Sequence, residues 1–159
     1  MRTLPLLAAT AVFGLAAATA SAAPAEFLHK AIQGDNSEMR LGQLAAQRGG
    51  SAAVKAYGKT LEQDHRTAKI QASAVARAHG ISVSTDVMPE AAAEYAKLQH
   101  LQGAAFDHEF ASYMTQDHEK DIADFQKEAD SSDPAYVRNL ARKTIPTLRK
   151  HLQMARSIG

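Results

Sequence analysis

Apolar positions recur every three to four residues along most of the chain. Between residues 52 and 79 they are Val54, Tyr57, Leu61, Ala68, Ala72 and Val75. This is the period of an amphipathic helix, sustained over about seven turns. Ser51 is a favourable N-cap for that helix, and Gly80 is a typical residue to end it. Only residues 81–89 have strand-like composition; they are few and end in proline, so we interpret them as a connection.

The same period predicts two further long helices. Over residues 24–48 the apolar positions are Phe27, Ala31, Met39, Leu41, Leu44 and Ala45, and over residues 104–129 they are Phe106, Phe110, Tyr113, Met114, Ile122 and Phe125. Gly49 and Gly50 end the first of these helices. The segment from Gly34 to Ser37 interrupts its apolar pattern, which indicates either a kink or a second N-cap.

The C-terminal residues predict a fourth long helix, which ends near Ser157. Asp133 is its predicted N-cap and Pro134 its first residue, since proline is favourable at that position. Pro146 lies inside the helix and should kink it, because proline lacks the N–H of the helical hydrogen bond. A shorter helix is predicted over residues 90–102.

These elements predict an all-α fold of two helical hairpins. One hairpin turns at Gly49-Gly50, and the other turns at residues 131–133. Roughly 25 residues, including the short helix, join the hairpins, and a link of that length can cross the bundle from end to end. We therefore predict a ferritin-like four-helix bundle with a crossover connection that contains a short extra helix. A plain up-and-down bundle is the alternative.

The N-terminal residues have the pattern of a signal peptide. Arg2 gives a positive start, residues 4–18 are apolar, and Ala20-Ser21-Ala22 fits an A-x-A cleavage site. We predict a signal peptide over residues 1–22 and a single helical-bundle domain over residues 23–159. The apolar run is short for a membrane span of about 20 residues, and no later run approaches that length.

Composition narrows the function. Alanine, the best helix former, occupies 33 positions, and the absence of cysteine excludes disulfides, thiol catalysis and thiolate metal sites. Without residues 1–22, which contain Arg2 and no acidic residue, the chain carries 17 basic and 17 acidic residues. A neutral chain without a basic stripe is not steered to polyanions, so we expect no nucleic-acid partner.

Several short segments resemble one known family. They are residues 38–45, 54–57, 64–65, 103–107, 117–119 and 145–148, with His151-Leu152. In their order and spacing they are similar to domain of unknown function 4142, a ferritin-like family often labelled a predicted outer membrane protein. The resemblance spans residues 25–157 and implies a periplasmic or envelope-associated helical bundle without an established activity. The label conflicts with the residues, because a barrel needs alternating strands of about 10 residues.

Four polar residues share the apolar faces and are candidate metal ligands: Glu38, His65, His118 and His151. At about 1.5 Å per residue, Glu38 lies about 17 Å and His65 about 22 Å from the first turn. His118 lies about 21 Å and His151 about 28 Å from the second turn. With the turns at opposite ends of a bundle about 38 Å tall, all four fall near mid-height.

Two i,i+3 pairs add possible ligands, because Glu62 shares a helix face with His65, and Asp121 shares one with His118. The last helix has Leu148 in place of the acidic partner of His151, so the full di-iron ligand set is not met. Imidazoles and carboxylates suit a divalent metal: zinc, iron or copper. Sequence thus predicts a mononuclear or degenerate site.

Three aspartates are assigned supporting roles. Asp64 and Asp117 point about 100° away from the histidines that follow them, so they either orient imidazoles of partner helices or simply face water. Asp107, about 37 Å from the second turn, belongs near a bundle end. Two functions stay open. One is a metal-binding bundle for metal handling or oxidative-stress defence. The other is a non-catalytic envelope or stress protein that binds an envelope partner or a second copy, with a structural polar network in its core. No motif predicts a particular enzymatic reaction.

Overall fold

The computed structural model describes residues 16–159, with side chains from residue 23 onward. It contains five helices: α1 (Ala16–Arg48), α2 (Ala52–Ala78), α3 (Pro89–Leu98), α4 (Gly103–Ala129) and α5 (Ala135–Ile158). Residues 1–15 of the predicted signal peptide, and the side chains of residues 16–22, lie outside the described residues. None of the five helices is both long and apolar enough to cross a membrane.

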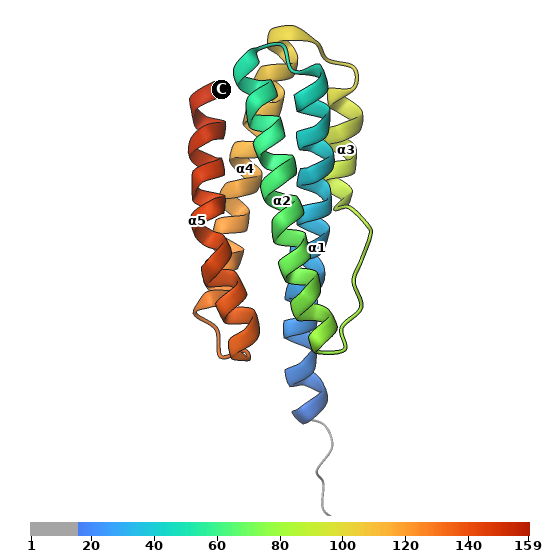
Figure 1. Ribbon diagram of the computed structural model, residues 1–159, viewed down its shortest axis with the longest axis vertical. Coiled ribbons are helices and arrows are strands. Elements are labelled where there is room, and N and C mark those ends of the chain that lie inside the picture. The colour runs from blue at the N-terminus through green and yellow to red at the C-terminus, as the bar shows by residue number, and fades with distance from the viewer. Residues whose placement is uncertain (1–15) are drawn as a thin grey trace, which may run out of the picture.

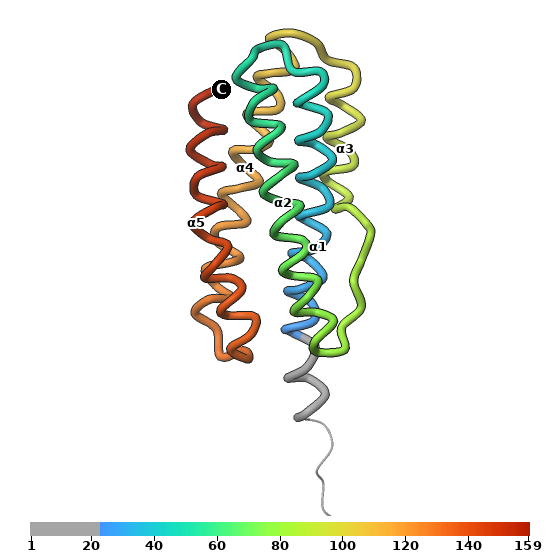
Figure 2. Tube along the Cα trace, in the orientation of Figure 1, coloured from blue at the N-terminus to red at the C-terminus, as the bar shows by residue number. Residues whose placement is uncertain are grey.

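The four long helices form two hairpins, α1–α2 and α4–α5, joined by a crossover link (Figures 1 and 2). The α1–α2 turn and the α4–α5 turn lie at opposite ends of the bundle (Figure 1). The link leaves the end of α2, runs beside α1 and leads through α3 to the start of α4 (Figure 2). The predicted ferritin-like bundle with its crossover is therefore confirmed.

Helix boundaries differ from prediction in detail. The short helix ends at Leu98 rather than residue 102, and α5 begins at Ala135 with Pro134 as its N-cap residue. Ser51 caps α2 as expected, since its side chain accepts a hydrogen bond from the Val54 amide. The α5 helix continues through Pro146 to Ile158.

The polar interruption at Gly34 to Ser37 neither ends α1 nor starts a new helix. Two of its side chains instead hold the crossover link. Asn36 Nδ2 donates to the carbonyl oxygens of Ser84 and Asp86, and Ser37 Oγ accepts a hydrogen bond from the Met88 amide. These positions are polar because they satisfy partly buried backbone groups of an irregular segment.

Glycine allows α1 and α2 to pack closely. A Cβ atom at Gly58 would lie 2.5 Å from the Gly42 carbonyl oxygen and 2.6 Å from the Ala46 amide nitrogen. A Cβ atom at Gly42 would lie 2.7 Å from the Gly58 carbonyl oxygen. The two backbones therefore meet directly. This contact fixes the position of α1 relative to α2 along the bundle axis.

The interior divides into two parts. The half of the bundle that contains the α1–α2 turn, here called the closed half, has one continuous apolar core that includes Leu41, Tyr57, Leu61, Phe106, Phe110 and Met114. The other half, here called the open half, has two smaller clusters, one around Leu28, Ile32 and Val137 and one around Ala129, Ala141 and Ile145. A cavity of about 400 Å³ is found on this side.

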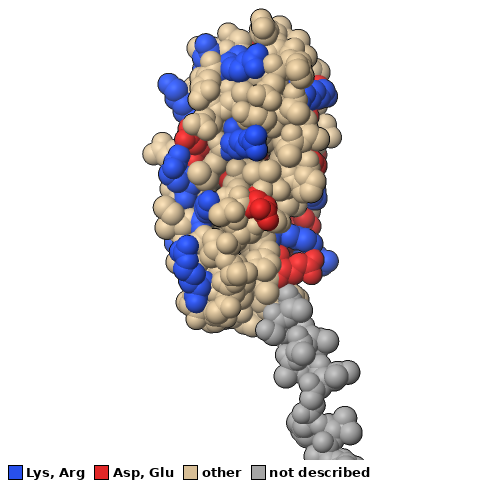
Figure 3. All heavy atoms as spheres, turned by 90° about the vertical axis from the view of Figure 1, so that its right-hand side faces the viewer, with Lys and Arg blue, Asp and Glu red and all other residues tan. Residues whose placement is uncertain are grey.

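The start of α4 is fastened to the α1–α2 turn. The Asp107 carboxylate accepts hydrogen bonds from the amides of Gly50 and Ser51, at 2.7 and 2.8 Å. Asp107 therefore lies at a bundle end, as predicted, and ties the link to the first hairpin. On the face that carries α3 and the link, charged side chains of both signs are interspersed (Figure 3).

Candidate functional site

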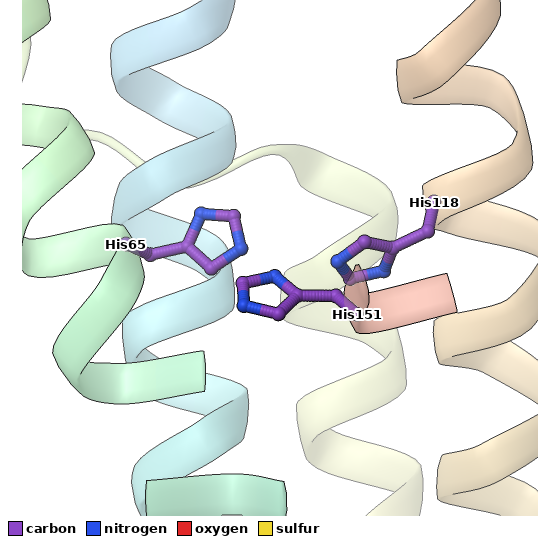
Figure 4. Close-up of side chains that lie close together, drawn as sticks. All are labelled: His65, His118 and His151. Atoms are coloured by element: carbon purple, nitrogen blue, oxygen red, sulfur yellow. The ribbon is translucent and has the colours of Figure 1, made fainter. Parts of the chain in front are cut away.

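Three histidine rings meet in the middle of the bundle, between its two halves. His65 comes from α2, His118 from α4 and His151 from α5, and the rings point toward one another (Figure 4). Their centroids are 6.0 Å apart for His65 and His118, 5.2 Å for His65 and His151, and 5.3 Å for His118 and His151. His65 is 4% exposed, and the other two are fully buried.

One nitrogen of each ring is held by a neighbouring oxygen. His65 Nδ1 lies 2.9 Å from Asp35 Oδ1, and His151 Nε2 lies 2.9 Å from Asp64 Oδ2. His118 Nδ1 lies 2.9 Å from the Met114 carbonyl oxygen. A carbonyl oxygen only accepts, so Nδ1 of His118 carries the proton and its Nε2 carries a lone pair. Such outer contacts fix the orientation of a histidine ring and its tautomer.

The other nitrogen of each ring faces the cluster. His65 Nε2, His118 Nε2 and His151 Nδ1 have no hydrogen-bond partner within residues 23–159. One ligand nitrogen from each ring lies within 4.8 Å of the other two. Buried polar atoms are almost always paired in proteins, so three unpaired nitrogens that face one another are a specific feature of this core.

Glu38, from α1, completes the cluster. It is 1% exposed, its ionised oxygens have no donor among the described residues, and in its protonated form it can donate a hydrogen bond to the nearby Asp117 carboxylate. Its Oε2 lies 3.9 Å from His65 Nε2, and its Oε1 lies 3.6 Å from His118 Nδ1. The four residues predicted to converge therefore do meet, one from each long helix.

Burial keeps the three imidazoles neutral. It lowers the pKa of His65 to about 4 and that of His151 to about 4. Burial, together with the neighbouring His65 and His151, lowers the pKa of His118 to about 3. Burial and then the Asp117 charge raise the pKa of Glu38 well above its usual value. Near neutral pH the cluster therefore offers unprotonated nitrogens beside a carboxyl group whose burial favours its protonated form.

The remaining predicted residues take different positions. Asp117 was predicted to support the ligands from outside. Instead its carboxylate forms a second group of close ligand atoms with Glu38 and His118. Asp64 lies behind His151, as proposed for it. Asp121 lines the cavity beside the cluster. Glu62 does not reach the cluster but pairs with Arg66 on the surface, at 2.6 Å, because its side chain points away from His65.

Sequence reasoning missed Asp35 and Tyr57. Asp35 is 8% exposed, and burial raises its pKa well above the usual value. It lies three residues before Glu38, and that i,i+3 spacing was the available signal. The Tyr57 hydroxyl is buried without a partner among the described residues, and the Tyr57 ring lies edge-on to His151 at 6.4 Å. Burial and then the Glu38 charge raise its pKa, so this hydroxyl stays protonated.

Comparison with known proteins now places the chain. Residues 11–158 match the family described as domain of unknown function DUF4142. The chain belongs to the DUF4142 family. This confirms the family suggested by the sequence motifs, and the match includes every residue of the histidine cluster. No curated protein matches the sequence.

A solved structure supports the fold independently. The chain is similar to the crystal structure of a DUF305 fragment from Deinococcus radiodurans, with a TM-score of 0.74. The alignment covers 85% of this chain and 93% of that fragment, at 20% sequence identity. At this identity the likeness shows a shared helical fold, and function has to be argued from the site itself.

Proposed function

We propose that this DUF4142 protein binds one divalent transition-metal ion through His65, His118 and His151. The observation that carries the proposal is the set of three unpartnered nitrogens, one on each buried ring, that face a common centre. Each ring is turned toward that centre by an oxygen on its outer side. Three inward imidazoles with outer hydrogen-bond partners are the usual construction of a histidine metal site.

Glu38 is the candidate fourth ligand. Its unpaired oxygens lie against two of the three rings, and its carboxyl group is buried away from water. A cation at the centre favours the ionised form of Glu38, so metal binding should release the proton that burial holds there. Asp117, close to both Glu38 and His118, would supply a further carboxylate oxygen near the ion.

The ligand types narrow the choice of metal. Imidazole nitrogens with one carboxylate suit zinc, copper or iron, and the chain has no thiolate. Calcium and magnesium prefer sites built from oxygen ligands, so we expect them to bind weakly. When bound, such an ion supplies a Lewis acid and, for copper or iron, a redox centre.

A structural polar network is the second candidate function of this cluster, and two contacts favour it. The pairs Asp35–His65 and Asp64–His151 would hold helices together without any ion. A network that served only packing should however pair its innermost groups, because an unpaired buried polar group costs about 1–3 kcal/mol. Instead the innermost nitrogens of all three rings have no partner within residues 23–159.

The proposal also includes a location. Residues 1–22 have the pattern of a cleavable signal peptide, which would direct the chain to the periplasm. There a bundle with one buried metal ion would serve metal handling by storing the ion. With a redox-active metal, it would serve defence against oxidative stress by destroying an oxidant.

Metal content of the protein from the periplasm, purified without a histidine tag, tests the proposal. Its intact mass should correspond to a chain that begins at Ala23, and elemental analysis should find about one equivalent of zinc, copper or iron. After chelation, added zinc should restore one equivalent. At free zinc 100-fold above the dissociation constant, binding should stabilise the fold by about 2.7 kcal/mol, visible as a higher unfolding temperature.

Two variants give this test its control. His118→Gln removes one ring of the cluster and should lower zinc affinity at least about 100-fold, whereas His108→Gln, an exposed histidine of the same helix, should leave it unchanged. A wild-type protein that holds no metal, and whose unfolding temperature does not respond to zinc, copper or iron, would favour the structural network instead.

A further inference from the structure

The cavity of the open half lies between the two hairpins. The α1 helix packs closely on α2 and α4 packs closely on α5, whereas the α1 and α4 backbones lie farther apart and meet through side chains such as Phe27 and Phe125. The cavity of about 400 Å³ fills this space and is lined mainly by residues of α1 and α4. Here it is called the α1/α4 cleft. Solvent thus approaches the centre of the bundle along one face.

Carboxylates dominate this cleft. Its lining includes eight acidic and three basic residues. Four of the acids, Asp117, Asp121, Asp124 and Glu128, follow one another on α4 at intervals of four, three and four residues, which places them on one helix face. Lys30, one of the three basic residues, is already paired with Glu26 at 2.7 Å.

From Asp124 toward the histidine cluster the α4 residues become more buried. Asp124 is exposed, Asp121 and Asp117 are half-buried, and His118 beyond them is fully buried. His65 itself lines the cleft, is 4% exposed, and its Nε2 has no hydrogen-bond partner within residues 23–159. The inner end of the cleft therefore lies at His65, a residue with an unpaired ligand nitrogen, and this observation is independent of the acids.

The opposite side of the cluster has a different charge. A cavity of about 310 Å³ between α2 and α5 also reaches His65, but its lining includes Lys143 and Lys150 and a single acid, Asp64. That acid already contacts both His151 and Lys150. A cation is therefore attracted to the α1/α4 cleft and repelled from the side between α2 and α5.

We propose that the α1/α4 cleft is the entry route for a divalent cation, which passes from Asp124 to Asp121 and Asp117 before it reaches the histidines. This inference rests on the proposed metal site and adds the path to it. Carboxylate oxygens bind transition metals more weakly than a set of imidazoles does, so they attract the ion without retaining it. Burial and the neighbouring Asp117 charge raise the pKa of Asp121 to about 8, so an arriving cation displaces the proton that Asp121 holds near neutral pH.

Rates of zinc binding test the route. Stopped-flow measurements with zinc chloride and a fluorescent zinc indicator give the association rate constant and the dissociation constant. The double variant Asp121→Asn/Asp124→Asn should associate about tenfold more slowly at low salt, because it removes the Asp124 charge and the Asp121 carboxyl group that would receive the ion, and steering by charge raises on-rates by roughly 10–1,000-fold. Its dissociation constant should stay within about threefold of the wild type, and added salt should slow the wild type more than the variant.

A matched control separates the cleft from net charge. Glu109→Gln/Glu119→Gln removes two acidic charges from the same helix outside the cleft and should leave the association rate within about twofold of the wild type. Equal rates for the two double variants would overturn the route while the metal site stands. A weaker dissociation constant at unchanged association rate would also overturn it, since Asp121 or Asp124 would then be a ligand. If Lys143→Gln/Lys150→Gln accelerates association more than tenfold, entry is from the other side.

A wild-type protein that binds no zinc at all would instead refute the proposed metal site. The two failures are distinguishable because the route concerns the rate, and the site concerns the equilibrium. Circular dichroism and thermal unfolding of each variant establish that all chains compared are folded.

Discussion

The closed and open halves of this bundle use the same four long helices in different ways. In the closed half, α1 and α2 touch backbone to backbone at Gly42 and Gly58, and one apolar core joins all four helices. In the open half, the apolar residues separate into two clusters with the acidic cleft between α1 and α4. The histidine cluster lies at the boundary.

This difference suggests how a small bundle can support a polar centre. Unpaired buried groups such as Glu38 destabilise a fold, so they need a rigid surrounding that is stable on other grounds. The closed half supplies that stability, while the open half supplies access. Separate changes to each half should therefore have separable effects on stability and binding.

The largest expected effect is loss of an aromatic ring from the closed half. Phe110 is fully buried and packs against Tyr57 and Phe106, with ring centroids 5.9 and 6.1 Å away. Phe110→Ala should lower the free energy of unfolding by about 3–5 kcal/mol in a urea titration. Phe125→Ala in the open half, where the ring is half-buried beside Phe27, should cost no more than about half as much. Equal losses would remove the distinction between the halves.

Glycine-to-alanine substitutions should change the free energy of unfolding in opposite directions in the two halves. A methyl group at Gly58 would collide with backbone atoms of α1, so Gly58→Ala should destabilise the fold by about 1–3 kcal/mol. No atom lies within 4 Å of a Cβ built at Gly34, which lines the cleft, so Gly34→Ala should stabilise the helix by about 0.5–1 kcal/mol. Thermal unfolding of both variants checks the comparison, and a destabilised Gly34→Ala would argue against an open cleft.

The last prediction concerns the pH dependence of stability. Burial and then the Asp117 charge raise the pKa of Asp121 to about 8, so the folded metal-free protein holds a proton there that the unfolded chain releases near pH 4. Wild-type stability should thus fall as pH rises from about 4 to about 8, by up to about 1.4 kcal/mol per pH unit from this group. Urea titrations of the metal-free Asp121→Asn variant should lack this contribution, and parallel curves for the two proteins would contradict it.

Much of the fold could be predicted from the sequence because its signals are local. The helical period, the Ser51 cap and the paired glycines are read from neighbouring residues, and the length of the link selects the crossover. The segment from Gly34 to Ser37 was harder. Its polarity suggested a break in the helix, but Asn36 and Ser37 serve a distant segment near residue 86, which no local pattern reveals.

The rise per residue of a helix also predicted that Glu38, His65, His118 and His151 lie at the same height in the bundle, because position along a straight helix depends only on residue count. Arithmetic does not show which nitrogen faces inward. That choice depends on partners such as Asp35 and the Met114 carbonyl group, which become neighbours only in the tertiary structure. The prediction of Glu62 as a possible ligand failed for the same reason, since an i,i+3 spacing does not show where the end of a long side chain lies.

The sequence distances within the histidine cluster also have a consequence for how the chain acquires it. His65 contacts an aspartate 30 residues away, and His151 contacts one 87 residues away. Contacts of such long range form late, because closing a long loop costs entropy before any contact compensates for it. A chain whose synthesis is incomplete, or one cut before α5, would lack one of the rings. Possession of the whole cluster therefore marks a molecule that has finished folding.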